Sequence, residues 1–180
     1  MELKKVKIST KSKGGLSMIT YRTFKEDDAV EVAQLVALTM RTTNRKDYSQ
    51  EYLENDLKHL TSQDFIEKAK YFHCYIFYDN QADKIVAVGS IGPYWGKKDE
   101  SSLFNIFVLP AYQGQGIGRK LITVLENDPY FIRARRIEIP ASITGLKFYQ
   151  KMGYSYKDGY RQLDDEKLYR LEKFNHPKTV

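Results

Sequence analysis

Cysteine is nearly absent from this chain, with Cys74 the only one among 180 residues. A single thiol excludes an internal disulfide framework and a zinc site built from cysteines. It is typical of a protein in a reducing compartment, so we expect a cytoplasmic location. Long apolar runs are also absent, since none approaches the roughly 18 residues of a membrane-spanning helix. The histidines, His59, His73 and His176, show no metal-ligand spacing, so no metal site is predicted.

The excess of positive charge is concentrated at the beginning of the chain. Residues 1–17 hold five lysines and one glutamate, which accounts for four of the six net positive charges. No apolar core of 7–15 residues follows these lysines, so they do not form a signal peptide. No aromatic residues are interleaved with them, so we expect a solvated, disordered extension. Nucleic-acid binding through these lysines is a weaker alternative, and the sequence leaves open whether residues 1–17 belong to the native protein.

The rest of the chain has the composition of a globular domain, with 42% hydrophobic and 29% charged residues overall. Its length fits a single domain over residues 18–180. Alternating and helical apolar periodicities predict a mixed α/β layer whose front half is largely antiparallel. The predicted order is strand, two helices, three strands, helix, strand, helix and two strands, about seven strands and four helices in all. Predicted strands cover 18–24, 71–78, 84–91, 102–109, 136–140, 154–157 and 168–174.

The most informative segment is Gln113–Gly118, where three glycines alternate between a predicted strand and a predicted helix. Such a loop lets backbone N–H groups approach a ligand, and the helix N-terminus adds roughly half a positive charge. A phosphate or pyrophosphate is the expected ligand. The residues after Gly118 are Arg119 and Lys120, which excludes a Walker loop. The third glycine comes one residue too early for a dinucleotide fingerprint. A tight turn without any ligand remains the alternative.

Two motifs in register resemble the GNAT acetyltransferase superfamily. The stretch Val108-x-Pro110-x-Tyr112-Gln113-Gly114-x-Gly116-Ile117-Gly118 resembles the acetyl-CoA signature of that superfamily. Phe148–Tyr154 resembles the end of its last conserved helix, and Tyr21–Asp27 is similar to its first strand and helix. The resemblance covers residues 18–174 and implies a GNAT-like acyl-CoA N-acyltransferase fold.

The resemblance also implies acetyl-CoA as co-substrate and a set of site residues. It implies that the loop binds the pyrophosphate and that an amide near Val108 faces the thioester oxygen. It implies Tyr149 as proton donor to the leaving thiolate. Around Glu100 the chain is similar to bacterial ribosomal-protein alanine N-acetyltransferases, which implies Glu100 as general base. The implied cofactor-binding residues are Val108, Gln113, Gly114, Gln115, Gly116, Ile117, Gly118, Arg119 and Ser142, the last at a position where the family often has asparagine.

The resemblance implies transfer of the acetyl group of acetyl-CoA to a primary amine, by direct attack in a ternary complex. The sequence leaves three acceptor classes open: a small amine, an amino acid or antibiotic, and a protein N-terminus. Residues 41–70 are expected to shape its selection. A non-catalytic acyl-CoA-binding regulatory module is the alternative function. A homodimer is a family-level expectation.

Overall fold

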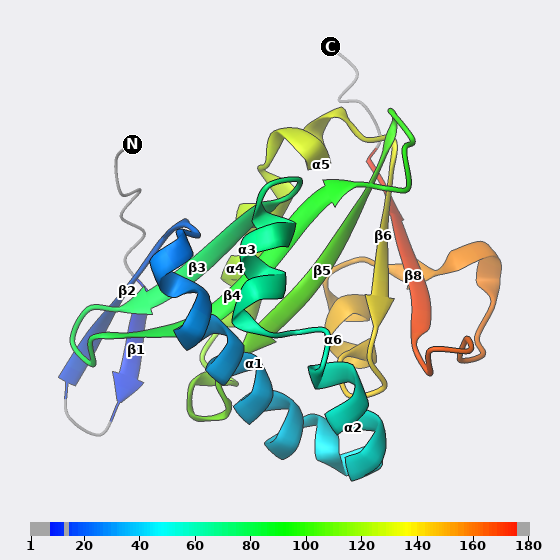
Figure 1. Ribbon diagram of the computed structural model, residues 1–180. Coiled ribbons are helices and arrows are strands. Elements are labelled where there is room, and N and C mark those ends of the chain that lie inside the picture. Colours follow the sequence, from blue (N-terminus) through cyan, green and yellow to red (C-terminus); the bar gives the residue numbers. More distant parts are fainter. Residues whose placement is uncertain (1–7, 13–14, 176–180) are drawn as a thin grey trace.

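The computed structural model describes residues 8–12 and 15–175, and within them the chain forms one mixed sheet with helices on both faces (Figure 1). The strands are β1 (Ile8–Ser12), β2 (Gly15–Thr23), β3 (His73–Asp79), β4 (Lys84–Pro93), β5 (Glu100–Val108), β6 (Arg136–Ala141), β7 (Ser155–Tyr156) and β8 (Tyr169–Phe174). The helices are α1 (Ala29–Thr42), α2 (Gln50–Leu57), α3 (Ser62–Ala69), α4 (Ile117–Glu126), α5 (Pro129–Arg133) and α6 (Leu146–Lys151). The predicted mixed α/β class is confirmed.

The sheet has the order β1-β2-β3-β4-β5-β6-β8-β7. Every neighbouring pair is antiparallel except β5 and β6, which run parallel. β1 pairs with β2 along its whole length and falls within residues 1–17, where a disordered extension is predicted. The structure therefore has a strand pair where composition alone favours a tail.

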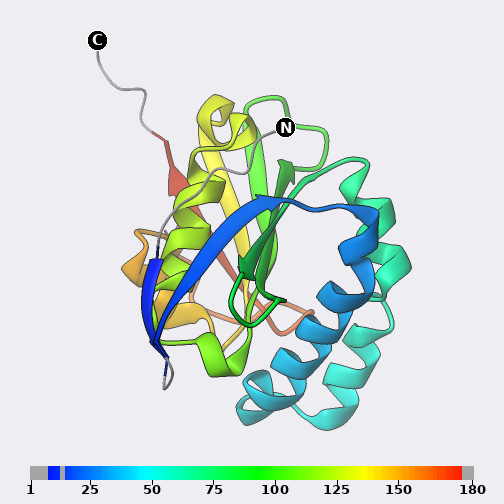
Figure 2. The same cartoon turned by 90° about the vertical axis from the view of Figure 1, so that its left-hand side faces the viewer.

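Apolar side chains divide into two cores, one on each face of the sheet. α1, α2 and α3 cover one face over a cluster that includes Val36, Leu53 and Ile76. α4 and α6 cover the other face, over a cluster that includes Leu121 and Ile137. Figure 2 shows the two helix groups on opposite sides of the sheet. Tyr149 belongs to the second core, so the face that carries it is opposite to the face that carries α1 and α2.

The helix boundaries follow local capping chemistry more closely than apolar periodicity. The second predicted helix corresponds to α2, which ends at Leu57, and Thr61 and Asp64 form a capping box that starts a separate helix, α3. Asp128 accepts a hydrogen bond from the amide of Tyr130 and begins the short helix α5. α6 begins at Leu146 instead of following directly from Ser142, because residues 142–145 form a turn with its own hydrogen bonds.

Candidate active site

The sheet opens at its centre, between β5 and β6. The two strands pair only where Glu100–Ser102 meets Arg136–Glu138. Beyond these residues they separate, and Figure 1 shows α6 at the wide end. Residues 103–108 of β5 therefore have no strand partner on this side. An unpaired strand edge offers amides and carbonyls to another extended group, so this opening is the natural place for a ligand.

A β-bulge lies on β5 beside this opening. Val88 pairs with Phe107 and Ser90 with Phe104, so Gly89 faces two residues, Asn105 and Ile106. Asn105 has a φ of 53°, in the left-handed region. Bulges of this kind re-aim a strand and are frequent beside active sites. Sequence reasoning missed this feature, for which the only signal is an asparagine inside an apolar strand.

The backbone of Val108 faces the opening. Val108 pairs with Ala87 of β4, and the amide of the next residue, Leu109, donates to the carbonyl of Val86. In an antiparallel ladder this pattern makes Val108 and Ala87 a non-hydrogen-bonded pair. The peptide groups of Val108 then lie on the other side of the strand. Its carbonyl accepts hydrogen bonds from the side chains of Gln113 (2.9 Å) and Thr39 (3.5 Å), which is consistent with this orientation.

The glycine loop after β5 presents a row of unused amides. Within the described chain, the N–H groups of residues 114–119 donate no hydrogen bond. Gly114 and Gly116 have φ values of 74° and 83°, which side chains other than glycine rarely adopt. A Cβ built on either residue meets no atom within 4 Å, so the loop borders open space. Successive free amides at a helix N-terminus favour an anion.

Side chains of the loop tie it to the end of β5 and to the C-terminal end of α1. Gln113 Nε2 donates to the carbonyl of Val108 and to Thr43 Oγ1 (3.1 Å), so one side chain ties the loop to two elements. Gln115 Nε2 donates to the carbonyl of Ala111 (2.8 Å).

The first residues of α4 complete the loop. Ile117 is buried in the core, and Arg119 is exposed. A Cβ on Gly118 would lie 3.3 Å from Phe148 Cζ and 3.8 Å from Val108 Cγ2. The structure thus brings together Val108, the glycine loop and the helix that carries Tyr149.

Tyr149 is buried on α6, with 8% of its surface exposed. Its hydroxyl makes no hydrogen bond to any residue in the described part of the chain. Burial raises the pKa of this hydroxyl well above its ordinary value, so it keeps its proton. A buried donor without a partner is costly, and a bound ligand would supply the missing acceptor.

The turn before α6 shapes the site of the Tyr149 ring. Ser142 Oγ accepts a hydrogen bond from the amide of Gly145 (3.1 Å), which closes the turn. A Cβ on Gly145 would lie only 2.9 Å from Cε2 of Tyr149. Gly145 is therefore needed to leave room for the ring. Ser142 acts here as a capping residue of the turn, within a residue or two of the open end of β6.

Glu100 lies at the closed end of the opening, apart from the other predicted site residues. Its carboxylate forms an ion pair with Arg136 at 2.5 Å. Arg136 also contacts Glu138 at 3.0 Å and Glu172 at 3.3 Å, so one guanidinium holds three carboxylates. Val108 comes eight positions after Glu100, roughly 25 Å along an extended strand. The structure does not bring Glu100 to the glycine loop.

Glu138 is a carboxylate that sequence reasoning missed. It pairs with Ser102 at the last paired position before β5 and β6 separate. Its side chain is 3% exposed and also contacts Lys157 at 2.8 Å. It lines a hollow of about 410 Å³ whose other walls are Tyr94, Trp95, Lys157, Asp164, Asp165, Glu166 and Arg170. The signal in the sequence was a single charge between Ile137 and Ile139, in a predicted strand.

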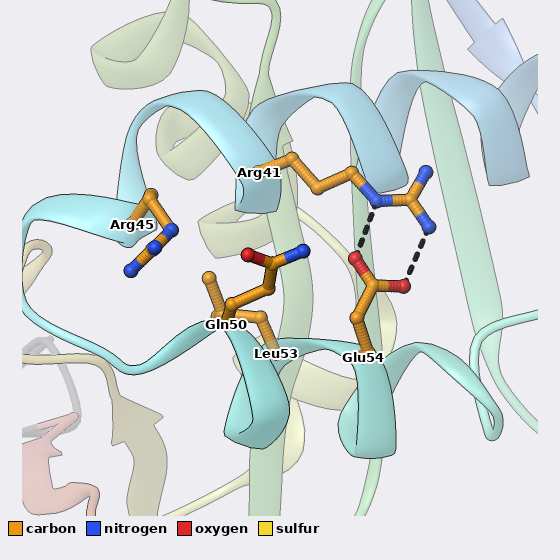
Figure 3. Close-up of a pocket in the computed structure, with 5 residues that line it drawn as sticks. All are labelled: Arg41, Arg45, Gln50, Leu53 and Glu54. Carbon is orange, nitrogen blue, oxygen red and sulfur yellow. Dashed lines mark hydrogen bonds and ion pairs between the residues drawn. The ribbon is translucent and has the colours of Figure 1, made fainter.

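A second hollow, of about 260 Å³, lies between α1 and α2 (Figure 3). Figure 3 shows Arg41 in a two-bond ion pair with Glu54, both bonds 2.7 Å long. Arg45, Gln50 and Leu53 complete its lining. The hollow falls within residues 41–70, where acceptor selection is predicted. It contains none of the predicted catalytic or cofactor-binding residues.

Within residues 8–12 and 15–175, no group of three or more histidine, cysteine, aspartate or glutamate side chains could hold a metal ion. No helix in the same part of the chain is long and apolar enough to cross a membrane. Cys74 is buried in the core beneath α1, α2 and α3, and burial raises the pKa of its thiol to about 11.

Comparison with known proteins defines the class of this fold. Residues 70–156 match the sequence model of the GNAT acetyltransferase domain. This segment includes the glycine loop, the bulge and Tyr149. The resemblance to GNAT acetyltransferases is thereby confirmed. Comparison with curated proteins gives no match.

Solved structures share the fold at low sequence identity. The PaiA N-acetyltransferase of Thermoplasma acidophilum, crystallised with coenzyme A, is 15% identical with a TM-score of 0.73, and the match covers 87% of this chain and 99% of that one. A GNAT acetyltransferase from Brucella melitensis in complex with acetyl-CoA is 19% identical with a TM-score of 0.58, covering 88% and 89%. The ribosomal-protein-S5-alanine acetyltransferase of Vibrio fischeri is 17% identical with a TM-score of 0.58, covering 90% and 98%. These likenesses establish the GNAT fold.

Proposed function

We propose that this protein transfers the acetyl group of acetyl-CoA to a primary amine. One observation carries the proposal: the loop with the free amides of residues 114–119 lies beside the open end of β5 and beside α6, the helix that carries the partnerless hydroxyl of Tyr149. These groups fit the parts of acetyl-CoA in turn. The loop amides suit its pyrophosphate, the strand edge suits its amide-bearing arm, and the hydroxyl suits its sulfur. Structures of this fold that hold coenzyme A or acetyl-CoA support the same ligand.

The acceptor amine enters through the hollow at the narrow end of the opening. An alkyl amine has a pKa near ~10, so it arrives as an ammonium ion and must lose a proton before it can attack. Glu138 lines this hollow and Glu100 does not, which supports Glu138 as the base. Glu100 instead holds Arg136, which in turn holds Glu138. This assignment replaces the role that resemblance implies for Glu100.

The neutral amine then attacks the thioester carbon, and negative charge develops on the thioester oxygen. The open-edge amides of β5, that of Val108 among them, are the donors available to stabilise this charge. The C–S bond breaks as the amide bond forms, and the thiolate takes a proton from Tyr149. The base has removed one proton from the ammonium and a second from the new amide nitrogen. One of them returns to Tyr149 through solvent, and the net products are the acetylated amine, the free thiol and one proton.

The charges of the hollow do not select one acceptor. Four carboxylates and two cations line it, so it admits a cationic amine or an amine that also carries a carboxylate. A protein N-terminus is supported by the open position of the hollow and by the similarity to the ribosomal-protein-S5-alanine acetyltransferase of Vibrio fischeri. A cytoplasmic location remains a proposal that rests on the lone cysteine.

The experiment that tests this function is a thiol-release assay with acetyl-CoA and three acceptors: 1,4-diaminobutane, free alanine and a peptide with an N-terminal alanine. We expect thiol release that depends on one of these amines and is lost when its nitrogen is already acetylated. Binding of acetyl-CoA with no amine-dependent release from any primary amine would instead support the non-catalytic regulatory module.

A further inference from the structure

Tyr48 joins segments that lie far apart in the chain. It precedes α2 and is 7% exposed. Its hydroxyl accepts a hydrogen bond from the amide of Ile143 (2.9 Å) and donates one to the carbonyl of Lys167 (2.9 Å). Those partners lie 95 and 119 residues further along the chain. One oxygen therefore connects three segments of the structure.

The two segments that Tyr48 connects belong to different parts of the candidate site. Lys167 closes a turn whose residues 164–166 form a wall of the 410 Å³ hollow. Ile143 lies in the turn of residues 142–145, and Gly145 of that turn contacts the ring of Tyr149. In the proposed reaction, the wall of residues 164–166 faces the acceptor, and the turn of residues 142–145 fixes the position of the proton donor, Tyr149. A displacement of either segment must stretch or break a bond to the same hydroxyl.

Neighbouring side chains strengthen both connections. The ring of Tyr52 stacks on that of Tyr48 with centroids 4.9 Å apart, and its hydroxyl donates to the carbonyl of Glu166 (2.6 Å). Asp47 accepts a hydrogen bond from Thr144 Oγ1 (2.6 Å). Burial raises the pKa of Tyr48, and it raises that of Tyr52 to about 12, with the nearby charge of Asp56 adding to it. Both phenols thus keep their protons at neutral pH.

We propose that Tyr48 is a positioning residue that couples the acceptor wall, residues 164–166, to the turn that places Tyr149. When acetyl-CoA fixes the Tyr149 side of the site, the bond from Ile143 holds Tyr48, and Tyr48 holds the wall through Lys167. The acceptor then meets a wall that is already ordered. This coupling rests on the proposed function, because it assumes that acetyl-CoA binds at the glycine loop and Tyr149.

Amide hydrogen exchange of the full chain, with and without acetyl-CoA, tests the coupling. The proteins are the wild type, Tyr48→Phe and the matched control Tyr52→Phe. The control loses a phenol bond to the same wall and keeps the bond between Tyr48 and Ile143. We expect acetyl-CoA to slow exchange at residues 113–119 in all three proteins. We expect it to slow exchange at residues 164–168 several-fold in the wild type and in the control, and not in Tyr48→Phe.

The outcomes distinguish a failure of the coupling from a failure of the proposed function. If acetyl-CoA leaves residues 113–119 of the wild type unchanged, the proposed function fails and the coupling fails with it. If residues 113–119 are protected and 164–168 are not, the coupling alone is wrong, and this wild-type arm decides even if a variant does not fold. Equal protection of 164–168 in the wild type and in Tyr48→Phe also overturns the role of Tyr48. A purely structural tyrosine would lower the melting temperature and leave the cofactor-dependent protection in place.

Discussion

The hydroxyl of Tyr149 is the single group on which the proposed chemistry depends most. It is buried, and it lacks a partner within the described residues. A group kept only for packing would be better replaced by phenylalanine, since a buried hydroxyl without a hydrogen bond costs about 1–3 kcal/mol. Its retention is understandable if it acts on a ligand.

Tyr149→Phe is therefore expected to lower amine-dependent thiol release about 10²-fold or more while acetyl-CoA binding stays the same. The melting temperature should stay level or rise, because an unpaired polar group is removed. Since burial raises the pKa of the hydroxyl, the wild type should not lose turnover through ionisation of Tyr149 even at pH ~10. Turnover close to that of the wild type would show that the thiolate takes its proton elsewhere.

The two glutamates at the narrow end of the opening are expected to differ. Glu138→Gln should reduce turnover about 10²-fold or more, because Glu138 faces the hollow. Glu100→Gln should reduce it by less than about 10-fold, because its carboxylate contacts Arg136 and not the hollow. Steady-state rates at saturating acetyl-CoA distinguish the two variants. The reverse order would support the role that sequence resemblance implies for Glu100.

The residues predicted from sequence divide according to the kind of signal they carry. Gln113, Gly116 and Tyr149 belong to local motifs with fixed spacing, so they could be found without a structure. Glu138 could not, because its importance comes from the pairing of two strands that are 36 residues apart. Tyr48 was equally hidden, since its partners lie in two distant turns. Local spacing reveals motifs, and it does not reveal which distant segments meet.

At the scale of elements, the glycine loop and the separation of β5 and β6 form the site together. Gly116→Ala should weaken acetyl-CoA binding, because a Cβ would project into the open space before the free amides. The left-handed φ of Gly116 adds a cost of roughly 1–2 kcal/mol. Binding titrations by calorimetry provide the measurement.

Gly159→Ala is the matched control for this prediction. Gly159 has a φ of 75° and open space around its Cβ position, so it carries the same backbone strain away from the loop. We expect both variants to melt at similarly lowered temperatures and only Gly116→Ala to bind acetyl-CoA more weakly. Equal affinities in the two variants would mean that the loop is a turn without a ligand.

The elements were predictable in type and order, and less so in detail. Apolar alternation located the central strands, and the glycine run located the start of α4. The bulge at Asn105 and the short pairing of β5 with β6 arise from contacts across the sheet, which apolar periodicity does not record. The strand β1 was missed because its residues have the composition of a solvated tail.

At the scale of the whole molecule, buried ion pairs make stability depend on pH. Asp28 is 7% exposed, and burial alone would raise its pKa. Hydrogen bonds from Arg22 and from the amide of Lys25 outweigh burial and hold that pKa below its ordinary value. A lowered folded-state pKa stabilises the protein above the unfolded value near ~3.9, and this contribution is lost as pH falls through the folded value.

Asp28→Asn is thus expected to lower the free energy of unfolding by roughly 1–3 kcal/mol at pH 7. The difference from the wild type should shrink toward pH ~2–3, where the wild-type carboxyl is protonated as well. Denaturant unfolding at both pH values measures it, with the exposed neighbour Asp27→Asn as a control that should change little. A difference that is the same at both pH values would show that Asp28 contributes by packing and not by charge.

The loop of residues 113–119 is the proposed binding site of acetyl-CoA. The most direct test is a thermal melt of the full chain with and without ~1 mM acetyl-CoA, beside ATP and NAD at the same concentration. A ligand present at 100 times its dissociation constant stabilises by about 2.7 kcal/mol, which raises the melting temperature of a chain of this size by roughly 5–10 °C. We expect such a rise with acetyl-CoA alone. No rise with acetyl-CoA, or an equal rise with ATP or NAD, would contradict it.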